Sequence, residues 1–189
     1  MTALRQLSEQ LLAGTLGTDE AQPMAPRFLA EPIAAGAYFV SSFANVAAFD
    51  TDDGLVLVDT GSFLLAEPTR KRLRELTKRP AHTAVWTHGH VDHCFGVDLY
   101  ERDSGRRVHV IAHEAVARRH ERYRLTRAWN QHVNERQFQT TAQFPGEFRA
   151  ADETYRDRKT LVVGGRTFEL THALGETDDH TWVWVPDAG

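Results

Sequence analysis

Apolar residues near the start of the chain recur at the spacing of a helix. The four leucines that carry this pattern are Leu4, Leu7, Leu11 and Leu12. Residues 1–17 are therefore predicted to form a short amphipathic helix, and a linker with three prolines follows it as far as Pro32. We expect residues 1–32 to form this N-terminal helix and linker, and residues 33–189 to form the main domain.

Beyond Pro32 the pattern changes to short apolar runs that end at turn residues, which predicts strands. The predicted strands cover residues 37–40, 45–49, 55–58, 81–87, 108–112, 161–163, 166–170 and 181–185. The two runs that flank Gly164-Gly165 are predicted to form a hairpin. Helices are predicted over residues 67–78 and 113–127, whereas residues 129–157 show no clear period. Strands interspersed with helices predict an α/β fold.

The composition narrows the class of protein. With 41% hydrophobic and 25% charged residues in 189 positions, the chain has the make-up of one soluble globular domain. A net charge of −4 gives no general reason to expect binding to nucleic acid or to an anionic membrane, and no apolar run is long enough to cross a bilayer. Cys94 is the lone cysteine, and residues 1–17 lack the basic start and apolar core that are typical of a signal peptide, so we expect a cytoplasmic location.

The strongest candidate for chemistry directly follows a predicted strand. It holds His88, His90, Asp92 and His93 within six residues. Imidazole and carboxylate together suit a borderline divalent ion such as Zn²⁺, with Fe or Mn as alternatives. In an extended loop the first two histidines point to the same side and can reach one ion, while Asp92 and His93 can serve a second. A histidine-rich surface loop is the alternative, and Cys94 either ligates a metal or packs the loop as a small thiol.

This His-x-His-x-Asp-His pattern resembles the signature of the metallo-β-lactamase superfamily of hydrolases. The resemblance covers residues 38–185 and includes the run Asp59-Thr60-Gly61 after a strand. It implies an αββα sandwich, of which this chain holds the first half, and a metal-dependent hydrolase with one or two zinc ions. It also implies a metal-activated hydroxide as the nucleophile, which Asp92 would orient as the catalytic residue.

A later stretch, Gly175-Glu176-Thr177, matches the turn in which most members of that superfamily carry a third histidine ligand. Glu176 falls at the place of the histidine, and a carboxylate oxygen binds Zn²⁺ at nearly the same distance. The alkylsulfatase branch similarly uses a glutamate there. The resemblance therefore implies that His88, His90 and Glu176 hold the first ion, and that the substrate is a sulfate ester or has another ester-like bond. A solvated turn is the alternative for Glu176.

Four further residues either ligate a metal or hydrogen-bond to its ligands in this interpretation: His172, His180, Asp59 and Asp179. Packing against neighbours and ordinary turns are the alternatives for them. Three arginines of the predicted helix after residue 113 could hold an anionic small-molecule substrate, or form a solvated basic surface: Arg118, Arg119 and Arg122. A nucleic-acid substrate would use the same arginines, but the rest of the chain is net acidic, which argues against it.

The resemblance also bears on partners. The superfamily carries a metal-bridging carboxylate after the next strand, and residues 186–189 come just short of it. We therefore expect an exposed apolar sheet face that a second polypeptide or a homodimer covers to complete the fold. Two alternative functions stay open: a non-catalytic or half-site module, and a flavodiiron-like redox site that would need a flavin domain absent from these residues.

Overall fold

The larger of two β-sheets forms the middle of the molecule. In the computed structural model, which describes residues 2–188, its seven strands follow one another in chain order. They are β1 (Ala30–Ala34), β2 (Ala37–Val40), β3 (Val46–Thr51), β4 (Gly54–Val58), β5 (Ala81–Val85), β6 (His109–His113) and β7 (Glu153–Tyr155). Strands β1 to β4 pair antiparallel and β4 to β7 pair parallel. The carboxyl ends of β4, β5 and β6 therefore lie along one edge of the sheet. Met1, where the expected N-terminal segment begins, and Gly189, where the expected main domain ends, lie outside the described residues.

A smaller antiparallel sheet packs on one face of the larger one. It consists, in order, of β10 (Thr181–Trp184), β9 (Arg166–His172) and β8 (Arg158–Val163). The predicted hairpin between β8 and β9 is confirmed, and Gly164 and Gly165 have φ angles of 47° and 81° there, as the two-residue turn requires. Phe168 of β9 packs with Val56 of β4 in the core between the two sheets.

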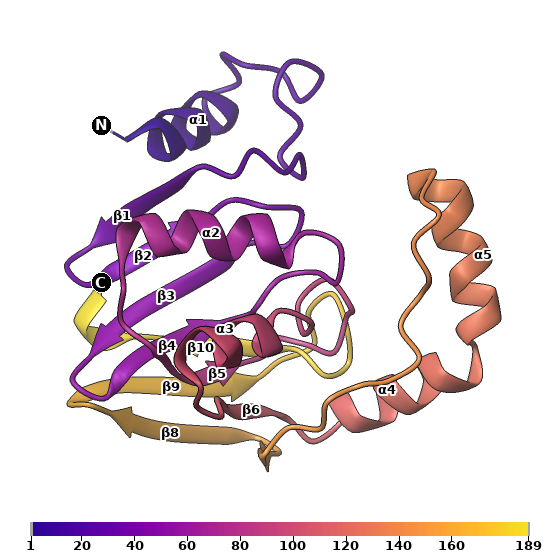
Figure 1. The fold of residues 1–189 in the computed structure, drawn as a ribbon. Coiled ribbons are helices and arrows are strands. Elements are labelled where there is room, and N and C mark those ends of the chain that lie inside the picture. Colours follow the sequence, from indigo (N-terminus) through magenta and orange to yellow (C-terminus); the bar gives the residue numbers. More distant parts are fainter. Residues whose placement is uncertain (1, 189) are drawn as a thin grey trace.

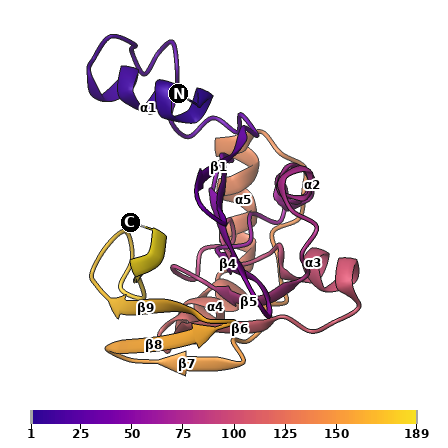
Figure 2. The same ribbon diagram turned by 90° about the vertical axis from the view of Figure 1, so that its left-hand side faces the viewer.

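Two helices cover the opposite face, α2 (Ala66–Leu76) and α3 (Val97–Ser104). Side chains alternate along β4, so Leu55 and Leu57 face these helices while Val56 faces the smaller sheet. Leu73 of α2 and Tyr100 of α3 complete this second core. Figure 2 views the larger sheet edge-on, with α2 and α3 on one side and β9 on the other. The layers are thus helix, sheet, sheet, and the mixed α/β class expected from the sequence is confirmed.

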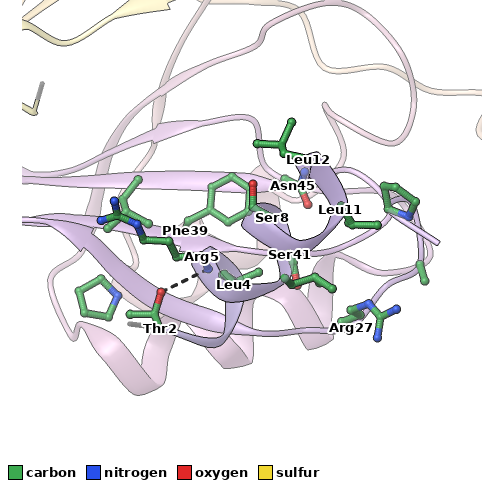
Figure 3. A pocket seen from close by; sticks show the side chains of 15 residues that line it. Thr2, Leu4, Arg5, Ser8, Leu11, Leu12, Arg27, Phe39, Ser41 and Asn45 are labelled. Carbon is green, nitrogen blue, oxygen red and sulfur yellow. Dashed lines mark hydrogen bonds between the residues drawn. The ribbon is translucent and has the colours of Figure 1, made fainter. Parts of the chain in front are cut away.

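The N-terminal helix α1 (Ala3–Leu12) lies beside the edge strand β1, where Glu31 accepts the backbone N–H groups of Ala3 and Leu4 at 2.8 and 3.1 Å. Its leucines and Phe39 of β2 line a groove of about 710 Å³, seen in Figure 3. The predicted linker is shorter than expected because β1 begins at Ala30. Pro32 fits inside β1 because the strand lies at the sheet edge.

The predicted helix over residues 113–127 is divided in the structure. His113 ends β6, α4 spans Val116–Leu125, and α5 (Arg127–Phe138) lies in the region that showed no clear period. Both helices extend from the edge at which the loops after β5 and β9 lie (Figure 1). Within residues 2–188, none of the helices combines the length and the apolar character needed to cross a bilayer.

Candidate metal centre

Three ligand-type side chains meet just beyond the carboxyl end of β5. His88 and His90 come from the loop after β5, and Glu176 comes from the turn between β9 and β10, which lies beside that loop (Figure 1). One ligand atom from each of the three residues lies within 4.8 Å of the others. The Nε2 atom of His88 is 3.7 Å from Glu176 Oε2, and His90 Nδ1 is 3.3 Å from Glu176 Oε1. The structure thus brings the three predicted first-ion ligands together, and their role as ligands stays a prediction.

The His88 side chain fits the requirements of a metal ligand. The residue is 1% exposed, and its buried Nε2 atom has no hydrogen-bond partner. Burial, reinforced by the neighbouring His93, lowers the pKa of His88 to about 4, so the ring is neutral at pH 7. A buried nitrogen without a partner is unfavourable, and a bound cation would satisfy it. Two imidazoles and one carboxylate form a donor set that Zn²⁺ accepts with a position left for water.

Asp59 fixes the orientation of the metal loop. It directly follows β4, is buried, and has a φ angle of 60°, a conformation that aspartate tolerates better than most residues. Thr87 donates both its backbone N–H and its hydroxyl to this carboxylate, each at 2.8 Å. Because a carboxylate only accepts, the Thr87 oxygen is left to accept from Nδ1 of His88, 2.9 Å away. The lone pair of the His88 ring therefore resides on Nε2, the atom nearest to Glu176.

Asp92 and His93 form a charged pair beside this centre. His93 Nδ1 lies 2.6 Å from Asp59 Oδ2, and His93 Nε2 lies 3.4 Å from Asp92 Oδ2. Burial disfavours a charge on the His93 ring, but the two carboxylates outweigh it and raise the pKa of His93 to about 10. Burial opposes the charge of Asp92 too, yet the hydrogen bond with His93 keeps its pKa below the ordinary value. These are the two predicted ligands of a second ion, and within residues 2–188 no three-ligand group forms around them.

A buried ion pair ties α4 to both segments of the centre. Arg119 Nε donates to both carboxylate oxygens of Asp179 at 3.0 Å, and its Nη2 donates to Asp178 at 2.5 Å. Asp179 Oδ2 also accepts the backbone N–H of Gly89 at 3.0 Å. The Asp179 side chain is fully buried and that of Arg119 is 9% exposed. Since Asp179 belongs to the same turn as Glu176, the pair holds this turn against the metal loop.

Gly89 is required by the close approach of this ion pair. A Cβ atom at position 89 would lie 2.9 Å from Asp179 Oδ2 and 3.1 Å from the Cδ atom of Arg119. The contact therefore leaves no room for a side chain in the middle of the His88-Gly89-His90 run.

The other predicted ligands lie at different distances from the centre. His172 stacks on His113 with 3.9 Å between ring centroids, and its Nε2 is 3.0 Å from the backbone oxygen of Asp178. His180 lies closer, with its ring centroid 5.7 Å from that of His88 and a buried Nδ1 atom without a partner. Neither belongs to the three-ligand group.

The thiol of Cys94 is buried and donates to the backbone oxygen of His88 at 3.2 Å, and burial raises its pKa well above the ordinary value. This is the arrangement of a packed thiol that supports the loop, the second of the two interpretations left open for it.

The three arginines considered for anion binding have different surroundings. Arg118 and Arg122 are exposed on α4, and Arg122 lies over the ring of Tyr123, 5.6 Å from its centroid. Arg119 instead pairs with two carboxylates of the protein, which differs from both alternatives, a substrate anion and a solvated surface. Sequence reasoning missed this pairing because the residues are 60 positions apart. It also missed Thr87, although the position of Thr87 next to the first ligand was a signal.

The sequence was compared with protein-family models and with curated proteins. The family model of the metallo-beta-lactamase superfamily matches residues 41–189. The alpha subunit of 2,4-dinitroanisole O-demethylase from Nocardioides sp. (strain JS1661) is 30% identical over 114 residues, which is 56% of this chain and 34% of that protein.

Solved structures show the same fold. A metallo-beta-lactamase with an HARLDQ motif from Cronobacter sakazakii superposes with a TM-score of 0.64 at 20% identity, covering 88% of this chain and 58% of that one. A B3 metallo-beta-lactamase described as having an active site glutamic acid superposes with a TM-score of 0.59 at 22% identity, covering 88% of this chain and 60% of that one. The chain therefore spans about three fifths of the length of these structures and about a third of the curated relative.

Proposed function

The chain belongs to the metallo-beta-lactamase superfamily, and from this premise we propose that it acts as a metal-dependent hydrolase. Its first ion is held by His88, His90 and Glu176, and zinc suits these donors, with iron or manganese as alternatives. The observation that carries the proposal is the buried Nε2 atom of His88, which has no hydrogen-bond partner among residues 2–188 and lies next to a carboxylate from another part of the chain.

The side chains around the ion have separate roles in this proposal. A divalent ion held by these residues would lower the pKa of a bound water molecule toward neutrality and would polarise the scissile bond. Asp92 orients the attacking water by accepting a hydrogen bond from it, since the pKa of this carboxyl is kept low. Thr87 holds His88 in the tautomer that leaves its Nε2 atom toward the centre, and Asp59 fixes the orientation of the His93 ring through its Nδ1 atom. Asp92 and His93 contribute to a second ion where one is bound.

The finer proposal is that the substrate is a sulfate ester or has another ester-like bond, as in the alkylsulfatase-like branch. The glutamate at the predicted third ligand position supports it. Arg118 and Arg122 are available to an anionic group at the surface of α4. An aryl methyl ether is the second candidate substrate, because the curated relative is named an O-demethylase.

Metal analysis paired with a substrate panel tests this function. The purified chain is loaded with zinc, and its metal content and turnover are compared with those of the His88→Ala/His90→Ala variant. The panel contains a sulfate ester, a phosphate ester, a lactone, a thioester and a nitroaryl methyl ether. We expect the isolated chain to hold one zinc ion tightly and to show only little turnover of the sulfate ester, still above the background of the double variant. That variant should lose the ion and keep most of the fold.

Full metal retention in the double variant contradicts the ligand assignment. Preferred turnover of the nitroaryl methyl ether supports the second candidate instead. Tightly bound iron together with oxygen reduction favours a redox site over a hydrolase.

We propose further that a second polypeptide or a second copy of the chain covers the outer face of the smaller sheet. Trp182 and Trp184 are 60% and 42% exposed there, with their rings stacked 6.5 Å apart, and β10 is the last strand of its sheet. Exposed apolar surfaces and open strand edges both favour association. Sedimentation velocity over a range of concentrations is the measurement. Trp182→Ser/Trp184→Ser should weaken association, whereas Trp129→Ser on α5, which is also exposed, should not.

A further inference from the structure

An apolar pocket lies directly beside the candidate centre. Its volume is about 200 Å³, and it is formed by the turn between β2 and β3, the loop after β4, the metal loop and α5. Phe43, Leu64, Leu65, Val91 and Phe138 give it apolar walls, and Asp92 forms part of its lining. The pocket and the centre therefore share a wall, because Val91 and Asp92 stand between His90 and His93 in the metal loop.

The walls of this pocket come from segments that are far apart in the sequence. Phe43 and Phe138 meet edge to face, with ring centroids 5.7 Å apart, although 95 positions separate them in the chain. Thus α5 contributes to the pocket by reaching back over the loops after β2 and β4. Because α5 has no fully buried residue, the contact between Phe43 and Phe138 is what holds this helix at the pocket.

Large apolar side chains at the pocket stay partly open to solvent. Leu64 is 44% exposed and Phe138 is 45% exposed. The lining also contains three polar residues, Ser62, Asp92 and Asn134. Apolar walls with a small number of polar groups are the usual make-up of a small-molecule site. An apolar cavity of about 150 Å³ is large enough for benzene, so this pocket holds one aromatic ring or a short aliphatic chain.

We infer that this pocket is the subsite for the non-reacting group of the substrate, and that this group is an aryl ring or an aliphatic chain of about six or seven carbons. The inference rests on the proposed hydrolase function for the position of the scissile bond, which would lie toward Asp92. It assigns the substrate to the apolar esters or sulfate esters rather than to sugar or nucleotide derivatives, whose polar groups would be buried there without partners.

Binding of straight-chain alcohols to the metal-free protein tests the subsite without any catalysis. Alcohols from ethanol to octanol are titrated and followed by NMR chemical shifts. In the native chain, affinity should rise by two- to fourfold for each added methylene, up to about six or seven carbons, and then level off. Leu64→Trp, which fills the pocket, should remove this dependence. Leu125→Trp, at an exposed position on α4 outside the pocket, should keep it.

A second variant keeps the test valid if Leu64→Trp does not fold. Leu64→Ala widens the pocket at its exposed rim and keeps the Phe43–Phe138 contact, so the chain length at which affinity levels off should increase. Affinity that is independent of chain length in the native chain, or unchanged by both Leu64→Trp and Leu64→Ala, overturns the subsite. If the alcohols bind as expected but the zinc-loaded protein hydrolyses no ester or sulfate ester, the subsite stands and the proposed hydrolase function fails.

Discussion

The Nδ1 atom of His93 lies 2.6 Å from the Oδ2 atom of Asp59, which is 34 positions earlier in the chain and directly follows β4. The same carboxylate oxygen receives the hydroxyl of Thr87, which in turn contacts His88. One buried carboxylate thus orients the imidazoles on which both predicted ions depend. Its φ angle of 60° shows that the backbone takes an uncommon conformation to place it there.

Replacing Asp59 with Asn should change the titration of His93 in the metal-free protein. The carboxylate stabilises the protonated ring, so its removal should lower the pKa of His93 from about 10 toward the ordinary value of 6.5. Histidine side-chain NMR over a pH series measures this directly. Asp157→Asn, in the exposed turn between β7 and β8, is the matched control and should leave His93 unchanged. An unshifted His93 in Asp59→Asn would show that Asp92 alone sets its charge.

Glu176→Gln should weaken zinc binding at the first site by about tenfold or more, the scale of loss seen when groups around a metal are altered. The change keeps the size of the side chain and removes its charge. Competition titration with a chelator gives the affinity. Glu169→Gln, exposed on β9, makes the same chemical change away from the centre and should have no effect.

Glu176→His tests the same ligand position by exchanging one ligand type for another. It creates the commoner three-histidine set, so its zinc affinity should be higher than that of Glu176→Gln. Unchanged affinity in Glu176→Gln would move the third ligand to His180, whose buried Nδ1 has no partner.

Arg119→Met should affect both stability and metal binding. It leaves the fully buried carboxylate of Asp179 without its cation, which should destabilise the fold by about 3–5 kcal/mol. It also releases the turn that carries Glu176, so zinc affinity should fall by about tenfold. Arg119→Met/Asp179→Asn removes both charges, keeps an acceptor for Gly89, and should recover part of the stability.

Arg149→Met is the control for Arg119→Met. Arg149 also pairs with two carboxylates, Glu101 and Asp152, but contacts no residue of the centre. Its loss should reduce the free energy of unfolding and leave zinc affinity unchanged. Equal zinc affinity in the two single variants would mean that the Arg119 pair supports the fold only.

Stability should fall as the pH is lowered from about 6.5 to about 4, partly because of His120. The ring is buried between Trp86 and Phe148, and this burial, together with Arg124, lowers the pKa of His120 to about 4. Above pH 6.5 the ring is neutral in both states. Below pH 6.5 the imidazole of His120 takes up a proton in the unfolded chain but not in the folded chain. This protonation stabilises the unfolded state and lowers the free energy of unfolding by up to about 3 kcal/mol.

Denaturation of the metal-free protein at several pH values measures this effect. His120→Phe should remove its part of the pH dependence, whereas His132→Phe, at an exposed position on α5, should retain it. Parallel stability curves for the native chain and His120→Phe would show that the ring is protonated in the fold.

The sequence alone determined the main strands, the hairpin at Gly164-Gly165, the layered α/β class and the family. These follow from local signals: the alternation or run of apolar residues, two adjacent glycines, and a histidine motif whose ligands lie within six residues. His88 and His90 could be placed on one side of a loop because only two positions separate them. Glu176 could be added because the turn around it resembles that of a known family.

Only the tertiary structure decided which distant groups surround these ligands. Residues 129–157 gave no periodic signal because α5 has no fully buried face, and its position depends on Phe138 meeting Phe43. The sequence left Arg119 either to an anionic substrate or to a solvated surface, because its partner Asp179 is 60 positions away and neither sequence segment indicates the other. Local patterns report which face of an element is apolar, whereas the pairing of buried charges and the walls of a pocket arise when the parallel strands bring their loops to one edge of the sheet.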